Sequence, residues 1–224
     1  MAKYIAVEGI DGTGKSVQTS LLKQALEQRG LKVGQLSFPD YESFFGKQIG
    51  RYLSGQDGVR ADTVDQKSMA LWFALDRWNT FQSFSDEGLD AVLINRYMLS
   101  NAVYQSIRDI DLGKEDLLSF CDELEFGVMG IPRPDLQVIL DVSPVSASEN
   151  VDKKGFRGYV GEKKDVYEEQ SSLQERGRRL YTAFAARLDN AVLIPCMENG
   201  ALLSIEAVHA MVLDAVLPLF EQPA

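Results

Sequence analysis

Residues that build disulfide frameworks and metal clusters are scarce in this sequence. Its 224 residues include two cysteines, Cys121 and Cys196, and one histidine, His209. The two cysteines have neither the spacing of a metal site nor the number that a disulfide framework needs, so we read them as ordinary core or surface residues. His209 lies among apolar residues near the C-terminus, where nothing beside it would make it a catalytic base. The expected setting is reducing and cytoplasmic.

Basic residues and long apolar runs are also scarce. The chain has 23 Lys and Arg against 33 Asp and Glu, which gives a formal net charge of −10. An acidic surface argues against nucleic acid or an anionic membrane as a partner. No unbroken apolar run approaches the length of a membrane span, and residues 1–3 lead into the first expected strand without a signal-peptide pattern. Any phosphate site must therefore be a local concentration of positive charge.

A phosphate-binding loop is the strongest feature that the sequence does contain. Gly9, Gly14, Lys15 and Ser16 have the spacing G-x-x-x-x-G-K-[ST], directly after the apolar run Tyr4–Val7 and before a helical pattern. A strand that turns abruptly into a helix points several backbone N–H groups and the positive end of the helix dipole at one small volume, which suits a polyphosphate. The side chains of Lys15 and Ser16 can then reach the phosphate oxygens and Mg²⁺. The predicted triphosphate-binding residues are Gly9, Ile10, Asp11, Gly12, Thr13, Gly14, Lys15, Ser16 and Val17.

Short apolar runs alternate with longer helical patterns along the whole chain. This alternation predicts one α/β domain, residues 1–224, with a five-stranded parallel sheet covered by helices on both faces, as in P-loop NTPases. The expected strands are 4–7, 33–38, 91–95, 136–141 and 191–195. The expected helices lie near 15–29, 44–54, 62–86, 98–108, 114–129, 166–189 and 204–219.

The segment 146–164 is basic and rich in glycine, unlike its neighbours. Five lysine or arginine residues, Arg157 among them, alternate with three glycines and few apolar residues. A run of charge is usually a solvated face. However, this run follows a strand's carboxyl end in an otherwise acidic protein, so it could also close over phosphates as a lid. Both interpretations stay open from the residues alone.

Two further places suggest a second substrate. Arg96 directly follows a predicted strand and should emerge at the carboxyl edge of the sheet, where ligands collect and where a guanidinium would pair with a phosphate. Phe73 and Arg77 lie four residues apart in a helical pattern, on one face, which would suit a planar base and its phosphate. A core phenylalanine beside a surface arginine explains this pair equally well.

Six segments occur together in the order and spacing of thymidylate kinases. They are residues 8–16, 38–41, 73–77, 96–104 with Arg96, Tyr97, Ser100, Asn101 and Tyr104, 132–135, and 165–168. The chain thus resembles the thymidylate kinase family. The resemblance implies a nucleoside monophosphate kinase architecture and transfer of the γ-phosphoryl group from ATP to dTMP, giving dTDP and ADP. It also implies Mg²⁺ and a homodimer that pairs the helix around 62–81.

For the base and sugar of dTMP, the resemblance implies roles by matching position. Phe73 would stack on the thymine, and Asn101 would hydrogen-bond it. Tyr104 would crowd the ribose 2′ position and favour the deoxy sugar. The implied acceptor site is completed by Phe38, Tyr41, Ser100 and Tyr167.

For the phosphates, the resemblance implies a set of charged groups. Arg77 would reach the base edge and the acceptor phosphate, and Arg96 would hold that phosphate in line with the donor. Asp11 would accept from the 3′-hydroxyl and help to place the metal. The loop at 9–16 has no arginine, so the transfer-assisting arginine would come from the lid, with Arg157 as the candidate. The implied catalytic residues are Lys15, Arg96, Arg157 and Asp11, and the implied metal ligands are Ser16, Asp11 and Glu168.

One position departs from the family pattern. Asn95 stands where an aspartate usually precedes the arginine, so a charge that helps to hold hydrated Mg²⁺ is missing. Glu8, Asp11, Asp141 or Glu168 could supply it. The alternatives to thymidylate kinase activity are a related nucleotide or deoxynucleoside kinase with another acceptor, or a P-loop nucleotide-binding protein with weak catalysis. A GTPase-like Asp-x-x-Gly match at 152–155 does not follow a strand, and the chain has no Asn-Lys-x-Asp motif.

Overall fold

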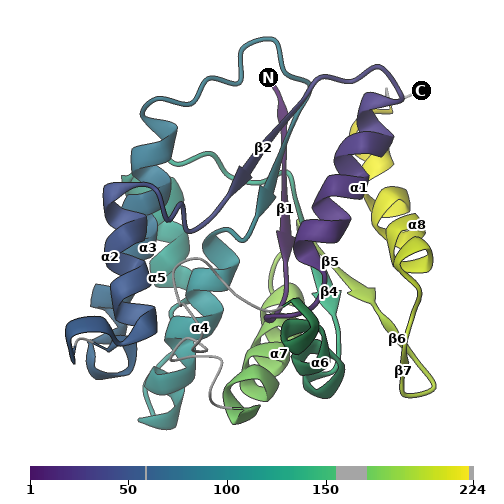
Figure 1. The fold of residues 1–224 in the computed structure, drawn as a ribbon. Helices are drawn as coiled ribbons and strands as arrows, with labels where there is room; N and C mark the ends of the chain where they lie inside the picture. Colours follow the sequence, from purple (N-terminus) through teal and green to yellow (C-terminus); the bar gives the residue numbers. More distant parts are fainter. Residues whose placement is uncertain (59, 155–170, 222–224) are drawn as a thin grey trace.

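The computed structural model describes residues 1–58, 60–154 and 171–221, and they form an α/β fold around one sheet (Figure 1). All pairs of neighbouring strands in this sheet are parallel, in the order β2-β3-β1-β4-β5. The strands are β1 (Lys3–Glu8), β2 (Val33–Ser37), β3 (Ala91–Asn95), β4 (Leu136–Asp141) and β5 (Ala191–Pro195). The five parallel strands expected from the sequence are confirmed.

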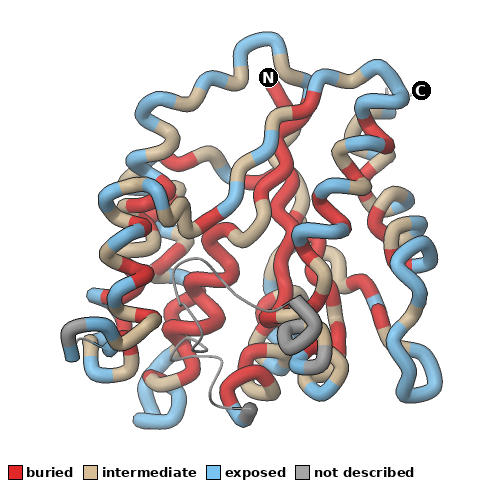
Figure 2. The backbone as a smooth tube through the Cα atoms, viewed as in Figure 1, coloured by how far each residue is buried: buried red, intermediate tan, exposed pale blue. Residues whose placement is uncertain are grey.

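Helices cover both faces of the sheet. On one face, α1 (Lys15–Glu27) packs against α8 (Ile205–Val216), and on the other α4 (Met98–Asp111) packs against α7 (Ser171–Ala185). Helices α2 (Phe44–Ser54) and α3 (Gln66–Phe81) lie outside α4, beside the short α5 (Leu118–Asp122) (Figure 1). The central strands β1, β3 and β4 and the inward faces of these helices are mostly buried, whereas the edge strand β2 and the outer faces of the helices have exposed residues (Figure 2). This arrangement explains why β1, β3, β4 and β5 are mostly apolar, whereas the edge strand β2 also contains Gln35 and Ser37.

The register of the central strands brings the functional segments together. Val7 of β1 pairs with Asn95 of β3, and Asn95 pairs with Ser37 of β2. Because parallel strands end at the same edge of the sheet, the loop after β1 and Arg96 after β3 lie side by side. The sequence-predicted phosphate site is therefore located at this edge.

Several helices begin at side-chain caps. The hydroxyl of Ser43 accepts a hydrogen bond of 2.8 Å from the backbone N–H of Gly46 at the start of α2. Asp65 accepts from the backbone N–H of Ser68 in α3, and Ser204 accepts likewise in α8. Such caps satisfy N–H groups that have no partner within the helix.

The helix boundaries differ from the sequence expectations at three places. The helix expected over 62–86 is shorter, since α3 is preceded by the 3₁₀ turns η1 (Gln56–Gly58) and η2 (Ala61–Thr63). The helix expected over 114–129 is broken into α5 and the π-helix η3 (Glu123–Val128). Helix α7 (Ser171–Ala185) ends before the expected end at 189, and residues 166–170 of the expected helix lie outside the described residues. Propensity and pattern alone do not reveal a π-helix, because its hydrogen bonds depend on tertiary contacts.

The segment expected as an irregular lid begins as a helix. Helix α6 (Pro144–Lys154) occupies the first part of 146–164, and the three glycines of the segment fall in 155–164, outside the described residues. A hairpin of β6 (Met197–Glu198) and β7 (Ala201–Leu202) and the 3₁₀ turn η4 (Leu217–Leu219) were not predicted. Among the described helices, none combines the length and the apolar character that crossing a bilayer would require.

Candidate functional site

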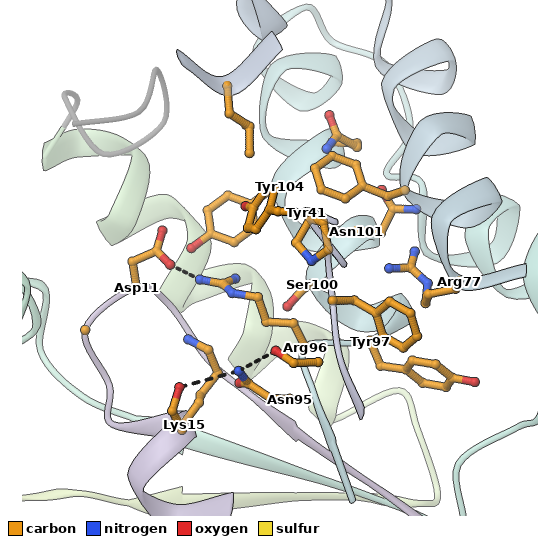
Figure 3. A pocket seen from close by; sticks show the side chains of 18 of the residues that line it. Asp11, Lys15, Tyr41, Arg77, Asn95, Arg96, Tyr97, Ser100, Asn101 and Tyr104 are labelled. Carbon is orange, nitrogen blue, oxygen red and sulfur yellow. Dashed lines mark hydrogen bonds and ion pairs between the residues drawn. The ribbon is translucent and has the colours of Figure 1, made fainter. Parts of the chain in front are cut away.

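A cavity of about 350 Å³ opens at the carboxyl edge of the sheet. Its walls come from the loop before α1, the ends of β2 and β3, and the inner faces of α3 and α4 (Figure 3). It is lined by Asp11, Gly12, Gly14, Lys15, Ser16, Ser37, Phe38, Pro39, Tyr41, Leu53, Phe73, Arg77, Asn95, Arg96, Tyr97, Ser100, Asn101, Tyr104 and Gln105.

The loop between β1 and α1 forms the cationic end of the cavity. Gly14 has a left-handed conformation (φ 87°) directly before α1, where a side chain would be strained. The buried ammonium of Lys15 lies across the loop and donates to the carbonyls of Gly9 and Ile10, at 2.9 and 2.6 Å. The N-terminus of α1 and the Lys15 charge thus point into one volume, which suits an anion.

Helix α6 packs directly on this loop. A Cβ atom at Gly12 (φ 82°) would lie 1.9 Å from the carbonyl oxygen of Ala147, so only glycine fits. The side-chain amide of Asn150 also donates to the carbonyl of Gly12, at 3.0 Å. The first part of the predicted lid is therefore anchored to the phosphate loop.

Arg96 enters the cavity from an unusual backbone conformation. Its φ is 64°, in the left-handed region that costs a residue with a side chain about 1 kcal/mol or more. Its guanidinium forms an ion pair with Asp11 and lies 5.8 Å from the centre of the Tyr104 ring. Figure 3 shows Lys15, Asp11 and Arg96 grouped at one end of the cavity.

Glu8 holds the chain segment that follows Arg96. This carboxylate is fully buried and accepts from the backbone N–H groups of Tyr97 and Ser100, at 2.7 and 3.3 Å. It also accepts from the hydroxyls of Ser100 and Tyr181, at 2.5 and 3.3 Å. Glu8 does not line the cavity and its carboxylate is occupied by these four hydrogen bonds, so this structure gives no support to the suggestion that it supplies charge to a metal. The Ser100 hydroxyl, expected at the acceptor, is engaged by Glu8.

The opposite end of the cavity contains a buried ion pair. Arg77 is 2% exposed and donates two hydrogen bonds of 2.6 Å to Glu125, which is fully buried. Burial lowers the pKa of the Arg77 guanidinium, but the neighbouring Glu125 carboxylate raises it by more, so the net shift is upward. The guanidinium also lies 6.0 Å from the ring centres of Phe38 and Tyr97. The alternative of a surface arginine at position 77 is therefore wrong.

Asp76 ties the segment after β2 to α3. Its carboxylate accepts from the backbone N–H of Asp40 and from the hydroxyl of Ser43, at 2.8 and 2.6 Å. Burial raises its pKa above the ordinary value, while these two hydrogen bonds act in the opposite direction. The segment held in this way contains Phe38 and Tyr41, which both line the cavity.

Gln174 of α7 connects the two walls near Asp11. Its side-chain oxygen accepts from the backbone N–H of Asp11, at 3.2 Å, and from the hydroxyl of Tyr104, at 3.3 Å. Its amide group donates to the Asp11 carboxylate, at 3.4 Å. Nothing local in the sequence distinguishes this glutamine, since its partners lie far away along the chain.

Most of the sequence-predicted site residues surround this one cavity. Gly9, Ile10, Thr13 and Val17 do not line it, although the Gly9 and Ile10 carbonyls accept from Lys15. Arg157, Tyr167 and Glu168 lie outside the described residues. The predicted residues that line the cavity are Asp11, Gly12, Gly14, Lys15, Ser16, Phe38, Tyr41, Phe73, Arg77, Arg96, Ser100, Asn101 and Tyr104.

The cavity offers oxygen donors for Mg²⁺ beside the phosphate loop. Asp11 and Ser16 both line it, and the side-chain oxygen of Asn95, close to Ser16, is buried without a partner among the described residues. Asp141 is paired with Arg178 at 2.5 and 2.9 Å and is thus committed elsewhere. In the described part of the chain, no group of three or more His, Cys, Asp or Glu could hold a metal. These residues fit an ion bound through few protein ligands together with water and phosphate, as Mg²⁺ is bound in kinases.

Comparisons with known proteins agree on one family. The sequence profile described as Thymidylate kinase matches residues 7–212. The thymidylate kinase of Mycobacterium tuberculosis (strain CDC 1551 / Oshkosh) is 34% identical over 186 residues, which cover 82% of this chain and 86% of that protein. The thymidylate kinase of Schizosaccharomyces pombe is 28% identical over 218 residues, covering 96% and 91%. The solved structure of the Candida albicans thymidylate kinase has the same fold, with a TM-score of 0.70 at 21% identity over 98% of this chain and 92% of that one.

Proposed function

This chain belongs to the thymidylate kinase family, whose members use ATP to phosphorylate dTMP to dTDP, and we propose how its cavity carries out that reaction. The observation that carries the proposal is the placement of two cationic groups, Lys15 and Arg96, at one end of a cavity whose other end contains Arg77 and Asn101. Two phosphate chains would meet at the first end, and the acceptor base would lie at the second.

The phosphate end positions donor and acceptor in line. Lys15 and the N–H groups of its loop bind the β and γ phosphates of ATP, and Arg96 binds the phosphate of dTMP. The ion pair with Asp11 holds Arg96 at the mouth of the loop, and an acceptor phosphate gives the guanidinium a second anionic partner. Asp11 accepts from the 3′-hydroxyl of the acceptor.

The base end binds the nucleoside of dTMP. Phe73 stacks on the thymine, and Arg77 and Asn101 contact its polar edge. Tyr104, held by its hydrogen bond to Gln174, fills the space beside the sugar C2′ and so favours the deoxy form. Phe38, Tyr41 and Ser100 complete this side, together with Tyr167 from outside the described residues.

The chemical step needs no protein nucleophile or base. A phosphate oxygen of dTMP attacks the γ-phosphorus, and the bond to the β–γ bridging oxygen breaks, so that ADP leaves with the electron pair. An ionised phosphate is a competent nucleophile at neutral pH, and the loose transition state is stabilised mainly by placement and by positive charge. Lys15 and Arg96 supply that charge, and Arg157 of the lid segment is the third candidate cation.

Mg²⁺ would be held by the Ser16 hydroxyl and Asp11, with Glu168 as a ligand from outside the described residues. When bound, it neutralises charge on the transferred phosphoryl group. We also propose that residues 1–224 act as one kinase domain in which the segment 146–164 closes over the phosphates.

We propose that the protein is a cytoplasmic homodimer. Two free, buried thiols suit a reducing compartment. The exposed apolar side chains of Phe44 in α2 and of Leu71 and Trp78 in α3 support a contact with a second copy through these helices.

Steady-state assays with a panel of acceptors test the proposed function. With ATP and Mg²⁺, dTMP should stimulate ADP release more than dUMP, dCMP or thymidine. Replacing the guanidinium in Arg96→Met should lower kcat/KM for dTMP by about 100-fold or more. The control Arg187→Met removes an exposed arginine that pairs with Asp116 and should leave the activity unchanged. ATP binding without acceptor-dependent turnover, or preference for another acceptor, would refute the proposal.

A further inference from the structure

Glu125 contacts both polar groups at the base end of the cavity. Its carboxylate receives two N–H groups of Arg77, and its Oε1 also accepts from the side-chain amide of Asn101, at 3.0 Å. It lies in the π-helix η3, fully buried, 48 residues from Arg77 and 24 from Asn101 along the chain. Such a group acts on the cavity only through its neighbours, since it does not line the cavity itself.

The orientation of the Asn101 amide follows from its partners. Its nitrogen donates to the carbonyl oxygen of Ala70 and to Glu125, both at 3.0 Å. Both partners can only accept, so a rotated amide would place its oxygen against two other oxygens. The amide oxygen is therefore turned away from Glu125, and it is buried without a partner among the described residues. An unpaired buried acceptor costs free energy, so a ligand that brings an N–H group to this oxygen is favoured.

Together these contacts define a pattern of one acceptor beside donors. Asn101 presents an oxygen, whereas Arg77 presents N–H groups, because a guanidinium has five and Glu125 takes two of them. Thymine and uracil present the complementary edge, with an N3–H donor next to a carbonyl acceptor. Cytosine presents the reverse, with a bare N3 next to an amino group, and would meet an acceptor with an acceptor.

We propose that Glu125 is a positioning residue for base specificity. By fixing the Asn101 amide and holding Arg77, it makes the cavity select pyrimidines that carry N3–H over cytosine. The inference rests on the proposed function in assuming that the acceptor base lies at this end of the cavity. It goes further in assigning selection to a residue that never touches the base.

The test compares Glu125→Gln with wild type for dTMP, dUMP and dCMP. Glutamine keeps the shape but offers an NH₂ group, so only the Ala70 carbonyl still opposes rotation of the Asn101 amide, and the preference for one base edge weakens. The dTMP:dCMP and dUMP:dCMP ratios of kcat/KM should fall by about 10- to 100-fold, where tenfold corresponds to about 1.4 kcal/mol. The dTMP:dUMP ratio, which reports only the methyl group, should not change. The control Glu123→Gln alters an exposed residue of the same π-helix and should change none of the ratios.

Two further measurements keep the inference falsifiable. In an Asn101→Ala background, Glu125→Gln should change the two ratios much less than in the wild type, because the amide that Glu125 fixes is gone and only its hold on Arg77 remains. If Glu125→Gln does not fold, Glu125→Asp retains the charge for Arg77 while withdrawing from Asn101, and it should lower the same two ratios. Equal losses for all three acceptors would overturn the positioning role. A wild-type protein that does not phosphorylate dTMP would refute the proposed function instead.

Discussion

The buried carboxylate of Glu8 offers the sharpest test of how the fold supports the site. It accepts from two backbone N–H groups, those of Tyr97 and Ser100, and from two hydroxyls. These contacts fix the turn that carries Arg96 with its φ of 64°. Replacing Glu8 should therefore weaken both the fold and the hold on the acceptor phosphate.

The loss of stability depends on how many of the hydrogen-bond donors around Glu8 still find an acceptor in the variant. In Glu8→Gln the remaining oxygen can still serve the two N–H groups, and the hydroxyls can turn to accept from the new NH₂ group. The loss is then mainly the charge assistance to two hydrogen bonds, about 1 kcal/mol each, or about 2 kcal/mol in total. In Glu8→Ala both buried N–H groups lose their partner, and the cost rises to about 4 kcal/mol.

Urea unfolding of both variants measures these differences. Glu198→Ala, which removes an exposed carboxylate from the β6–β7 hairpin, is the control and should change the free energy of unfolding by less than about 0.5 kcal/mol. The KM for dTMP should rise in Glu8→Ala, whereas the affinity for ATP should change less. If Glu8→Ala lost no more stability than the control, Glu8 would not support the Arg96 turn.

Three other changes test separate parts of the structure. Asn95→Asp should preserve dTMP binding and shift the Mg²⁺ dependence of turnover, and an unchanged Mg²⁺ titration would remove Asn95 from metal handling. Gly12→Ala should cost about 3 kcal/mol or more in urea unfolding, because its Cβ would overlap a carbonyl of α6; Gly113→Ala, with a φ of 72° and no atom within 4 Å, should cost only about 1 kcal/mol. Burial, and then the charge of Arg29, lower the pKa of His209. Just below the ordinary histidine pKa, the folded protein therefore keeps this side chain neutral, whereas the unfolded chain protonates it. The free energy of unfolding should therefore rise with pH just below the ordinary histidine pKa, and His209→Gln should lack this part of the slope; identical slopes would contradict it.

The sheet and the position of Arg96 beside the loop at 9–16 could be predicted from the sequence. Four of the five strands are mostly apolar because helices cover both faces, so this pattern can be recognised in the sequence. The phosphate loop is a local motif too, and the placement of Arg96 beside it follows from the parallel strand order. These features depend on neighbouring residues along the chain.

The residues that support the cavity without lining it could not be predicted from the sequence. Glu125 and Gln174 act through partners 48 and 163 residues away, and neither has a motif around it. The composition of 146–164 suggested a solvated face or a lid, whereas its first part belongs to α6, which is held by its contact with Gly12. Tertiary contacts between distant residues decide these features, and a single sequence does not display them.

The pairing of Arg77 with Glu125 constrains how this protein can evolve. A buried ion pair that loses one member leaves an uncompensated charge in the interior, at a cost of about 3–5 kcal/mol, which is a large share of the stability of an ordinary domain. A mutation at one of the two positions should therefore persist only when the other position changes with it. A descendant of this chain that changed its nucleobase preference through Glu125 would therefore lose stability unless Arg77 changed as well.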